Sequence, residues 1–189
     1  MKKAIIASVI ALGMGASAAQ AADVPTNEIQ FHGTVSATTC DIEATVDGSM
    51  SPNGANRIEL GDVALGGDGK AVAFTFKPVQ TPQNIAACDQ IATNNKTPSL
   101  TWTGRYFSSA GLGLIPGFGD AQDSFVQITP VNDKSQAKTF INATGTKHEF
   151  DVSALSSTGG QGLKYTAMLK GGNTAGEFNT AANYNLTYK

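Results

Sequence analysis

Short segments in which apolar and polar residues alternate recur along this chain, and turn residues separate them. Such alternation places the apolar side chains on one face of a β-strand. The expected strands lie at residues 29–35, 58–60, 72–78, 99–103, 124–129, 147–152 and 164–169. Glycine pairs and Asp-Gly steps mark the turns, and only residues 85–91 suggest a helical turn or two. The pattern predicts a single all-β domain of the sandwich type.

Residues 176–189 alternate over a longer stretch than the other segments. One face of this segment carries Phe178, Thr180, Ala182, Tyr184, Leu186 and Tyr188. The opposite face is mostly asparagine, so the alternation predicts a final strand rather than a frayed tail. A long exposed strand edge normally invites pairing with another segment, which raises the question of what covers this one.

The first 21 residues have the features of a secretory signal peptide. Lys2 and Lys3 precede an apolar run at residues 4–12, and Ala19-Gln20-Ala21 is a small-residue cleavage pattern. We therefore expect an exported chain that begins at Ala22 after processing. The apolar run is too short for a membrane span, so we expect a protein that is not embedded in a membrane.

The chain contains two cysteines, Cys40 and Cys88. In an exported protein, an even number of cysteines most simply forms disulfide bonds. A bridge across this loop would stabilise the fold by about 4 kcal/mol on the chain-entropy model. Two unpaired buried thiols are the alternative.

The sequence shows no residue pattern typical of an enzyme or a metal site. His32 fits a surface strand position and His148 a strand that enters the core, and neither has a catalytic partner in sequence. The glycine-rich run at 111–119 precedes no helix, so it favours a surface loop over a phosphate site. Asp120 and Asp123 lie close together in the sequence, but two carboxylates without a placed acid partner are weak evidence for a catalytic site. With 13 basic and 15 acidic residues, the chain also lacks the excess of positive charge that is typical of a protein that binds nucleic acid. We expect no catalysis, no cofactor and no metal.

The two ends of the chain carry a family resemblance. Phe31-His32-Gly33-Thr34-Val35 and the following Cys40 have the pattern F-x-G-x-V-x4-C, and Cys88 follows at a similar spacing. At the other end, Gly176 precedes the alternating residues and the penultimate Tyr188. Together with IELGDVALGGDGKAVAFTFKP and SLTWTG, this order resembles major fimbrial (pilin) subunits of the chaperone-usher pathway, enterotoxigenic-type subgroup.

The resemblance implies an incomplete immunoglobulin-like β-sandwich, the pilin fold, at residues 33–189. This sandwich would lack its last strand, leaving a groove that a donor strand from a partner completes. A periplasmic chaperone would fill the groove first, and an outer-membrane usher would then exchange it for residues 22–32 of a neighbouring copy. Because such a head-to-tail contact does not close, it generates a fibre.

The resemblance also assigns residues to both sides of this contact. The donor segment offers Val24, Thr26 and Ile29 as anchors, and Asn27 stands near the place where the family has a glycine. Val24 and Ile29 lie five positions apart and cannot both face the groove in an unbroken strand, so the register stays open. The residues expected to line the groove and to contact chaperone and usher are Gly176, Phe178, Tyr184, Leu186 and Tyr188.

The leading hypothesis for function is a structural subunit of an adhesive surface fimbrium, exported through the periplasm, that contributes to attachment to host cells. One alternative is a minor fimbrial subunit. Another is a shaft subunit that itself binds a host glycan or glycoprotein, through a candidate receptor loop with Tyr106, Phe107 and Phe118. Trp102 is expected in the core rather than in a sugar site. A freestanding β-sandwich enzyme or carrier is a third hypothesis, for which the sequence offers no convergent polar site.

Overall fold

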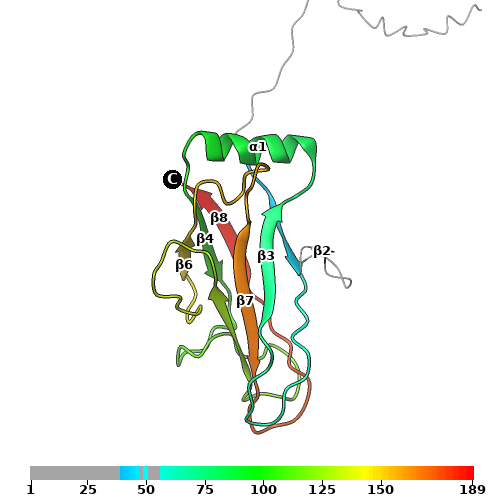
Figure 1. The fold of residues 1–189 in the computed structure, drawn as a ribbon. Helices are drawn as coiled ribbons and strands as arrows, with labels where there is room; N and C mark the ends of the chain where they lie inside the picture. The colour runs from blue at the N-terminus through cyan, green and yellow to red at the C-terminus, as the bar shows by residue number, and fades with distance from the viewer. Residues whose placement is uncertain (1–38, 47–48, 51–55) are drawn as a thin grey trace, which may run out of the picture. The chain divides into compact units, whose positions relative to one another are not determined.

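The computed structural model describes residues 39–46, 49–50 and 56–189. Within this part of the chain, the strands form two antiparallel sheets with the orders β2-β1-β3-β7-β5 and β6-β4-β8 (Figure 1). The strands are β1 (Ile42–Val46), β2 (Ser49–Met50), β3 (Val72–Pro78), β4 (Pro98–Thr103), β5 (Phe125–Pro130), β6 (Lys147–Glu149), β7 (Leu163–Lys170) and β8 (Asn183–Tyr188). The predicted signal peptide, the donor segment and the strand at 29–35 lie outside the described residues.

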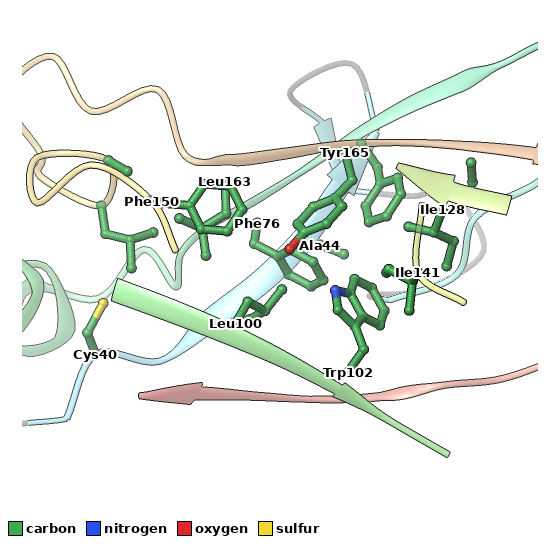
Figure 2. Close-up of a cluster of buried hydrophobic side chains, with 14 of the residues drawn as sticks. Cys40, Ala44, Phe76, Leu100, Trp102, Ile128, Ile141, Phe150, Leu163 and Tyr165 are labelled. Carbon is green, nitrogen blue, oxygen red and sulfur yellow. The ribbon is translucent and has the colours of Figure 1, made fainter. Parts of the chain in front are cut away.

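The core lies between the two sheets and is rich in aromatic rings. Along β7, buried residues alternate with half-buried ones, which is the pattern of a strand with one face on a core. Tyr165 on this strand is fully buried, and its ring centroid lies 5.4 Å from that of Trp102 on β4. Phe76 on β3 lies 5.8 Å from the same indole (Figure 2). The predicted core position of Trp102, which is 4% exposed, is confirmed.

One helix, α1 (Pro82–Thr93), lies across one end of the sheets, near the C-terminus (Figure 1). The Thr81 hydroxyl accepts the backbone N–H of Asn84, and Pro82 occupies the first turn, where its missing N–H costs nothing. The sequence predicted only a turn or two at 85–91. The predicted helix was too short because it left out Thr81 and Pro82, two residue types that are typical of the start of a helix.

A disulfide joins Cys40 to Cys88, with their Cα atoms 4.8 Å apart, as predicted. It fixes the chain just before β1 to the middle of α1. The Asn84 side chain adds to this link, since its amide nitrogen donates to the carbonyl oxygens of Asp41 at 2.8 Å and Val79 at 2.9 Å. The start of β1, the end of β3 and the helix are thereby held together.

Two predicted strands differ from the structure. The strand expected at 147–152 ends at Glu149 as β6, because the chain turns directly after Phe150. The strand expected at 58–60 is absent from both sheets. Ile58 and Leu60 are nevertheless half-buried and alternate with exposed neighbours, as strand residues do. This segment has the side-chain pattern of a strand without a strand partner among the described residues.

Candidate strand-accepting groove

The last strand, β8, is the edge of its sheet. It pairs with β4 along its whole length, from Pro98↔Tyr188 to Thr103↔Asn183, and no described strand pairs with its other edge. Tyr184, Leu186 and Tyr188 are half-buried and pack against the core, while the residues between them are exposed. The predicted alternation of the final segment is confirmed, and it leaves an apolar strand face beside an open backbone edge.

Side chains, rather than a strand, span the gap from β8 to β1 in the other sheet. The Tyr188 hydroxyl donates to the carbonyl oxygen of Cys40 at 2.9 Å. The Tyr184 hydroxyl lies 3.2 Å from the carbonyl oxygen of Ile42 and 3.3 Å from Oδ1 of Asn56. Among the described residues, the two sheets are therefore joined along this side by side-chain contacts and by no strand.

A cleft of about 1090 Å³ continues this opening toward the loops at the end of the sandwich away from α1. It is lined by residues 56–65, 171–172 and 174–182 and by Tyr184. Its floor consists of core side chains, namely Phe74, Phe76, Trp102, Leu114, Val126, Ile128, Ala167 and Leu169. We call the opening between β8 and β1, together with this cleft, the groove. An apolar floor beside a strand edge that has no described partner suits an added β-strand.

The structure brings most of the groove residues predicted from the resemblance together. Phe178 and Tyr184 line the cleft, and Leu186 and Tyr188 continue the same face toward Cys40. Gly176 also lines the cleft but has a local role as well. Its φ of +149° is one that side chains rarely adopt, and an added Cβ would lie 2.5 Å from Cβ of Asp120. The donor residues Val24, Thr26 and Ile29 lie outside the described residues.

Burial raises the pKa of both groove tyrosines. Desolvation raises the pKa of Tyr188 to about 12, against a smaller opposing effect of its hydrogen bond to Cys40. Desolvation also raises the pKa of Tyr184. At neutral pH both hydroxyls are therefore hydrogen-bond donors to the opposite wall.

The loop predicted as a receptor site spans residues 106–120. The Phe118 side chain is 68% exposed, and its ring centroid lies 6.5 Å from that of Tyr106. The Arg105 guanidinium lies 4.9 Å from the centre of the Tyr106 ring. Phe107, by contrast, is half-buried against the core. The loop thus brings two of its three predicted residues together.

This loop is attached to the groove wall. The N–H groups of Gly117 and Phe118 donate to the carbonyl oxygen of Asn179 at 2.7 and 3.2 Å, and the Asn179 N–H donates back to Phe118 at 3.1 Å. Asn179 belongs to the extended segment that leads into β8. The receptor-loop prediction and the groove prediction therefore concern neighbouring surfaces.

Sequence reasoning missed Asn56. This residue has a φ of +67°, and its Oδ1 accepts the N–H of Ala44 at 3.1 Å. Asparagine is one of the few residues that adopt this left-handed conformation readily, which is the only signal the sequence offers. Nothing in the alternation pattern placed it beside Tyr184.

Two of the polar residues set aside in the sequence, His148 and Asp123, have structural contacts, and His32 lies outside the described residues. His148 is buried on β6, and its Nδ1 lies 3.1 Å from the Tyr165 hydroxyl. The Asp123 carboxylate accepts the backbone N–H groups of Asn173 at 2.6 Å and Thr174 at 3.1 Å. Among the described residues, no three His, Cys, Asp or Glu side chains gather as a metal site would require. The same part of the chain contains no helix with the length and apolarity of a membrane span.

Comparison with known proteins gives two relatives that cover the chain. The F107 fimbrial protein of Escherichia coli is 35% identical over 189 residues, with 100% of both chains covered. The K99 fimbrial protein of Escherichia coli is 30% identical over 198 residues, with 100% of this chain and 99% of that protein covered. No family model matches the chain.

Among solved structures, the P pilus rod subunit PapA matches with a TM-score of 0.56. The match covers 86% of this chain and 100% of PapA at 22% identity, so the likeness concerns the fold. It agrees with the two-sheet sandwich described above, and the predicted pilin fold is confirmed.

Proposed function

The chain belongs to the family of fimbrial proteins that includes F107 and K99, and from this premise we propose that its groove receives residues 22–32 of a neighbouring copy. As a fimbrial protein it is a structural component of the cell surface and not an enzyme. The fold is that of a pilus rod subunit. The proposal adds the contact by which one copy binds the next copy in the fibre.

The observation that carries the proposal is the unpaired edge of β8 beside an apolar groove. A strand added there would gain backbone hydrogen bonds along the edge and would bury its alternate side chains on the core floor. Eleven residues in extended form span about 36 Å. Residues 22–32 and the wall segment 178–188 have this same length, so one donor segment can cover the whole wall.

The register of the donor strand depends on which of its side chains enter the groove. Val24 and Thr26 share one face of an extended strand, and Ile29 lies on the other face. Either the first pair or Ile29 enters the groove unless a bulge shifts the alternation. The proposal includes both registers.

The same groove explains the need for assembly factors. An exposed edge with an apolar floor associates with whatever strand is available, so a chain awaiting assembly needs a temporary occupant. We assign this part to a periplasmic chaperone and the exchange step to an outer-membrane usher, following the family resemblance. Because each copy offers a donor at one end and a groove elsewhere, the contact does not close and a fibre grows.

A terminal fusion tests the proposal. Residues 22–32 are moved behind Lys189 on a short linker, so that a chain can fill its own groove. We expect this self-complemented chain to be monomeric in size-exclusion chromatography and to unfold at higher denaturant than the unfused mature chain, which should self-associate.

The matched control is the same fusion with Val24, Thr26 and Ile29 all replaced by aspartate, which disables the anchors in either register. This control should lose the added stability. Equal stability of fusion, control and unfused chain would contradict the proposal.

A second candidate function is recognition of a host glycan by the loop at 106–120. The observation that favours it is the pair of Tyr106 and the exposed Phe118, with Arg105 over the tyrosine ring. Aromatic faces of this kind can stack on sugars. Glycan-array binding by the self-complemented chain should then fall after Phe118→Ala and persist after Val131→Ala, a change at an exposed apolar residue elsewhere. If none of these chains binds a glycan, only the structural role remains, whether the chain is a major or a minor subunit.

A further inference from the structure

The backbone of β1 has an open side that faces the groove. Successive residues of a strand direct their backbone groups to opposite edges. At Asp41 these groups face away from the groove, since its carbonyl oxygen accepts the N–H of Val79 at 2.9 Å and its N–H donates to Asn84. At Cys40, Ile42 and Ala44 the groups face the groove. These are the positions at which a strand lying in the groove would hydrogen-bond to β1.

Side chains already occupy those positions. The Tyr188 hydroxyl is on the carbonyl oxygen of Cys40, the Tyr184 hydroxyl is near that of Ile42, and Oδ1 of Asn56 accepts the Ala44 N–H. One hydroxyl has a single proton, so Tyr184 donates either to Ile42 or to Asn56 at any moment. β2 pairs with this edge only at Thr45 and Val46. From Cys40 to Ala44, the three side chains thus satisfy a part of the edge that has no strand partner among the described residues.

We propose that Tyr184, Tyr188 and Asn56 are temporary partners of the β1 edge, and that an incoming strand must displace them before it can pair with β1. This inference rests on the proposed function of the groove and assigns a further role to three of its residues. The temporary bonds stabilise the empty groove and thereby slow the entry of a donor strand. They act as a barrier to exchange and not as contacts to the donor.

The geometry allows the hydroxyl contribution to be separated from packing. The Tyr184 ring packs 4.5 Å from the Phe76 ring, measured between centroids, and would keep this contact as phenylalanine. Asn56 is exposed, and glycine tolerates its φ of +67°. Tyr184→Phe, Tyr188→Phe and Asn56→Gly therefore each remove polar atoms while leaving the surrounding structure in place.

The experiment measures uptake of a labelled synthetic peptide of residues 22–32 by the mature chain, kept dilute to limit self-association. The association rate follows from the rise in label anisotropy. Because a hydrogen bond of this kind has a small net contribution, each tyrosine variant should take up the peptide about 2- to 10-fold faster than wild type. Asn56→Gly should act in the same direction.

Two variants serve as controls. Tyr106→Phe removes a hydroxyl from a half-buried tyrosine outside the β8 wall, and should leave the rate unchanged. Asn56→Asp keeps an oxygen acceptor for the Ala44 N–H in a residue that tolerates the same backbone conformation, and should stay close to wild type. Thermal unfolding of each chain verifies that it is folded. If a tyrosine variant does not fold, Asn56→Gly alone decides.

Unchanged or slower uptake by the folded variants would overturn the inference while leaving the proposed function intact. Slower uptake in particular would mean that the hydroxyls contact the donor. A wild-type chain that takes up no peptide at all would overturn the proposed function, and this inference with it.

Discussion

Gly176 shows how a single residue can serve two purposes. The family resemblance assigns it to the recognition motif at the end of the chain. Its backbone supplies an independent reason for glycine, since φ is +149° and residues 120 and 121 leave no space for a Cβ. The Ala121 N–H also donates to the neighbouring carbonyl oxygen of Glu177 at 3.2 Å. Glycine here lets the 120–121 loop close against the segment that leads into β8.

Gly176→Ala should therefore lower the free energy of unfolding by about 2–4 kcal/mol, from backbone strain together with the clash at Asp120. Denaturant unfolding of the self-complemented chain measures this loss. Gly61→Ala is the matched control, because Gly61 has a φ of +71° but no atom within 4 Å of an added Cβ. It should lose only the strain, about 1 kcal/mol. Equal losses at both sites would contradict the role of the clash.

The raised pKa of Tyr188 predicts a weakness in alkali. An unfolded tyrosine titrates near pH 10, whereas in the fold desolvation raises this pKa to about 12. The stabilising contribution is complete below about pH 10 and disappears as the pH rises toward 12. Tyr188→Phe should flatten the loss of stability across this window when unfolding is followed at several pH values. Parallel curves for the two chains would exclude this account.

At the scale of whole elements, the alternating strands could be predicted and their exceptions have physical reasons. β3, β4, β7 and β8 bury one face on a core within the same chain, so their residues alternate and the sequence shows it. Residues 58–60 alternate too but form no strand, because no described strand lies beside them. The buried face of α1, at Asn84, Ala87, Cys88 and Ile91, has the helical period, but it begins with a polar residue, while the apolar Ile85 and Ala86 lie off it, so the apolar pattern of the sequence is weak here.

Some residues of the candidate site could likewise be predicted from the sequence, and others could not. Tyr184, Leu186 and Tyr188 were predictable because they repeat every second residue on one strand. Asn56 was not, because its partner Tyr184 is 128 positions away and a single side-chain contact leaves no periodic signal. Residues that repeat with the period of a strand can be found in a sequence, whereas a single side-chain contact between distant positions can be found only in a structure.

The disulfide links β1 to α1 across a sequence separation of 48 residues. Replacing both Cys40 and Cys88 by alanine should lower the free energy of unfolding by about 2–4 kcal/mol, because the unfolded chain regains the freedom of that loop. Denaturant unfolding of the self-complemented chain measures the effect. Reduced wild type should lose a similar amount. An unchanged midpoint in both samples would show that Asn84 and its hydrogen bonds hold this corner alone.

At the scale of the whole molecule, the proposed function requires each copy both to donate a strand and to accept one. A chain that lacks residues 22–32 keeps its groove and loses its donor segment. Added in small amounts to assembling wild type, it should shorten the fibres seen by electron microscopy, since it accepts a donor and offers none.

The control for this mixture is the self-complemented chain, whose groove is already filled and which should leave fibre length unchanged. Fibres of normal length in the presence of the shortened chain, or fibres formed by the shortened chain alone, would contradict the assignment of residues 22–32 as the donor.

Trp102 has a consequence for observing assembly. It is the single tryptophan of the chain, it lies on the floor of the groove, and its ring centroid is 6.3 Å from that of Tyr184. Light absorbed by tyrosine at this separation passes to the indole, whose emission wavelength depends on the polarity around it. On the proposed function, a strand that enters the groove would change the surroundings of this indole, so an unlabelled chain would carry its own optical reporter of whether its groove is empty or filled.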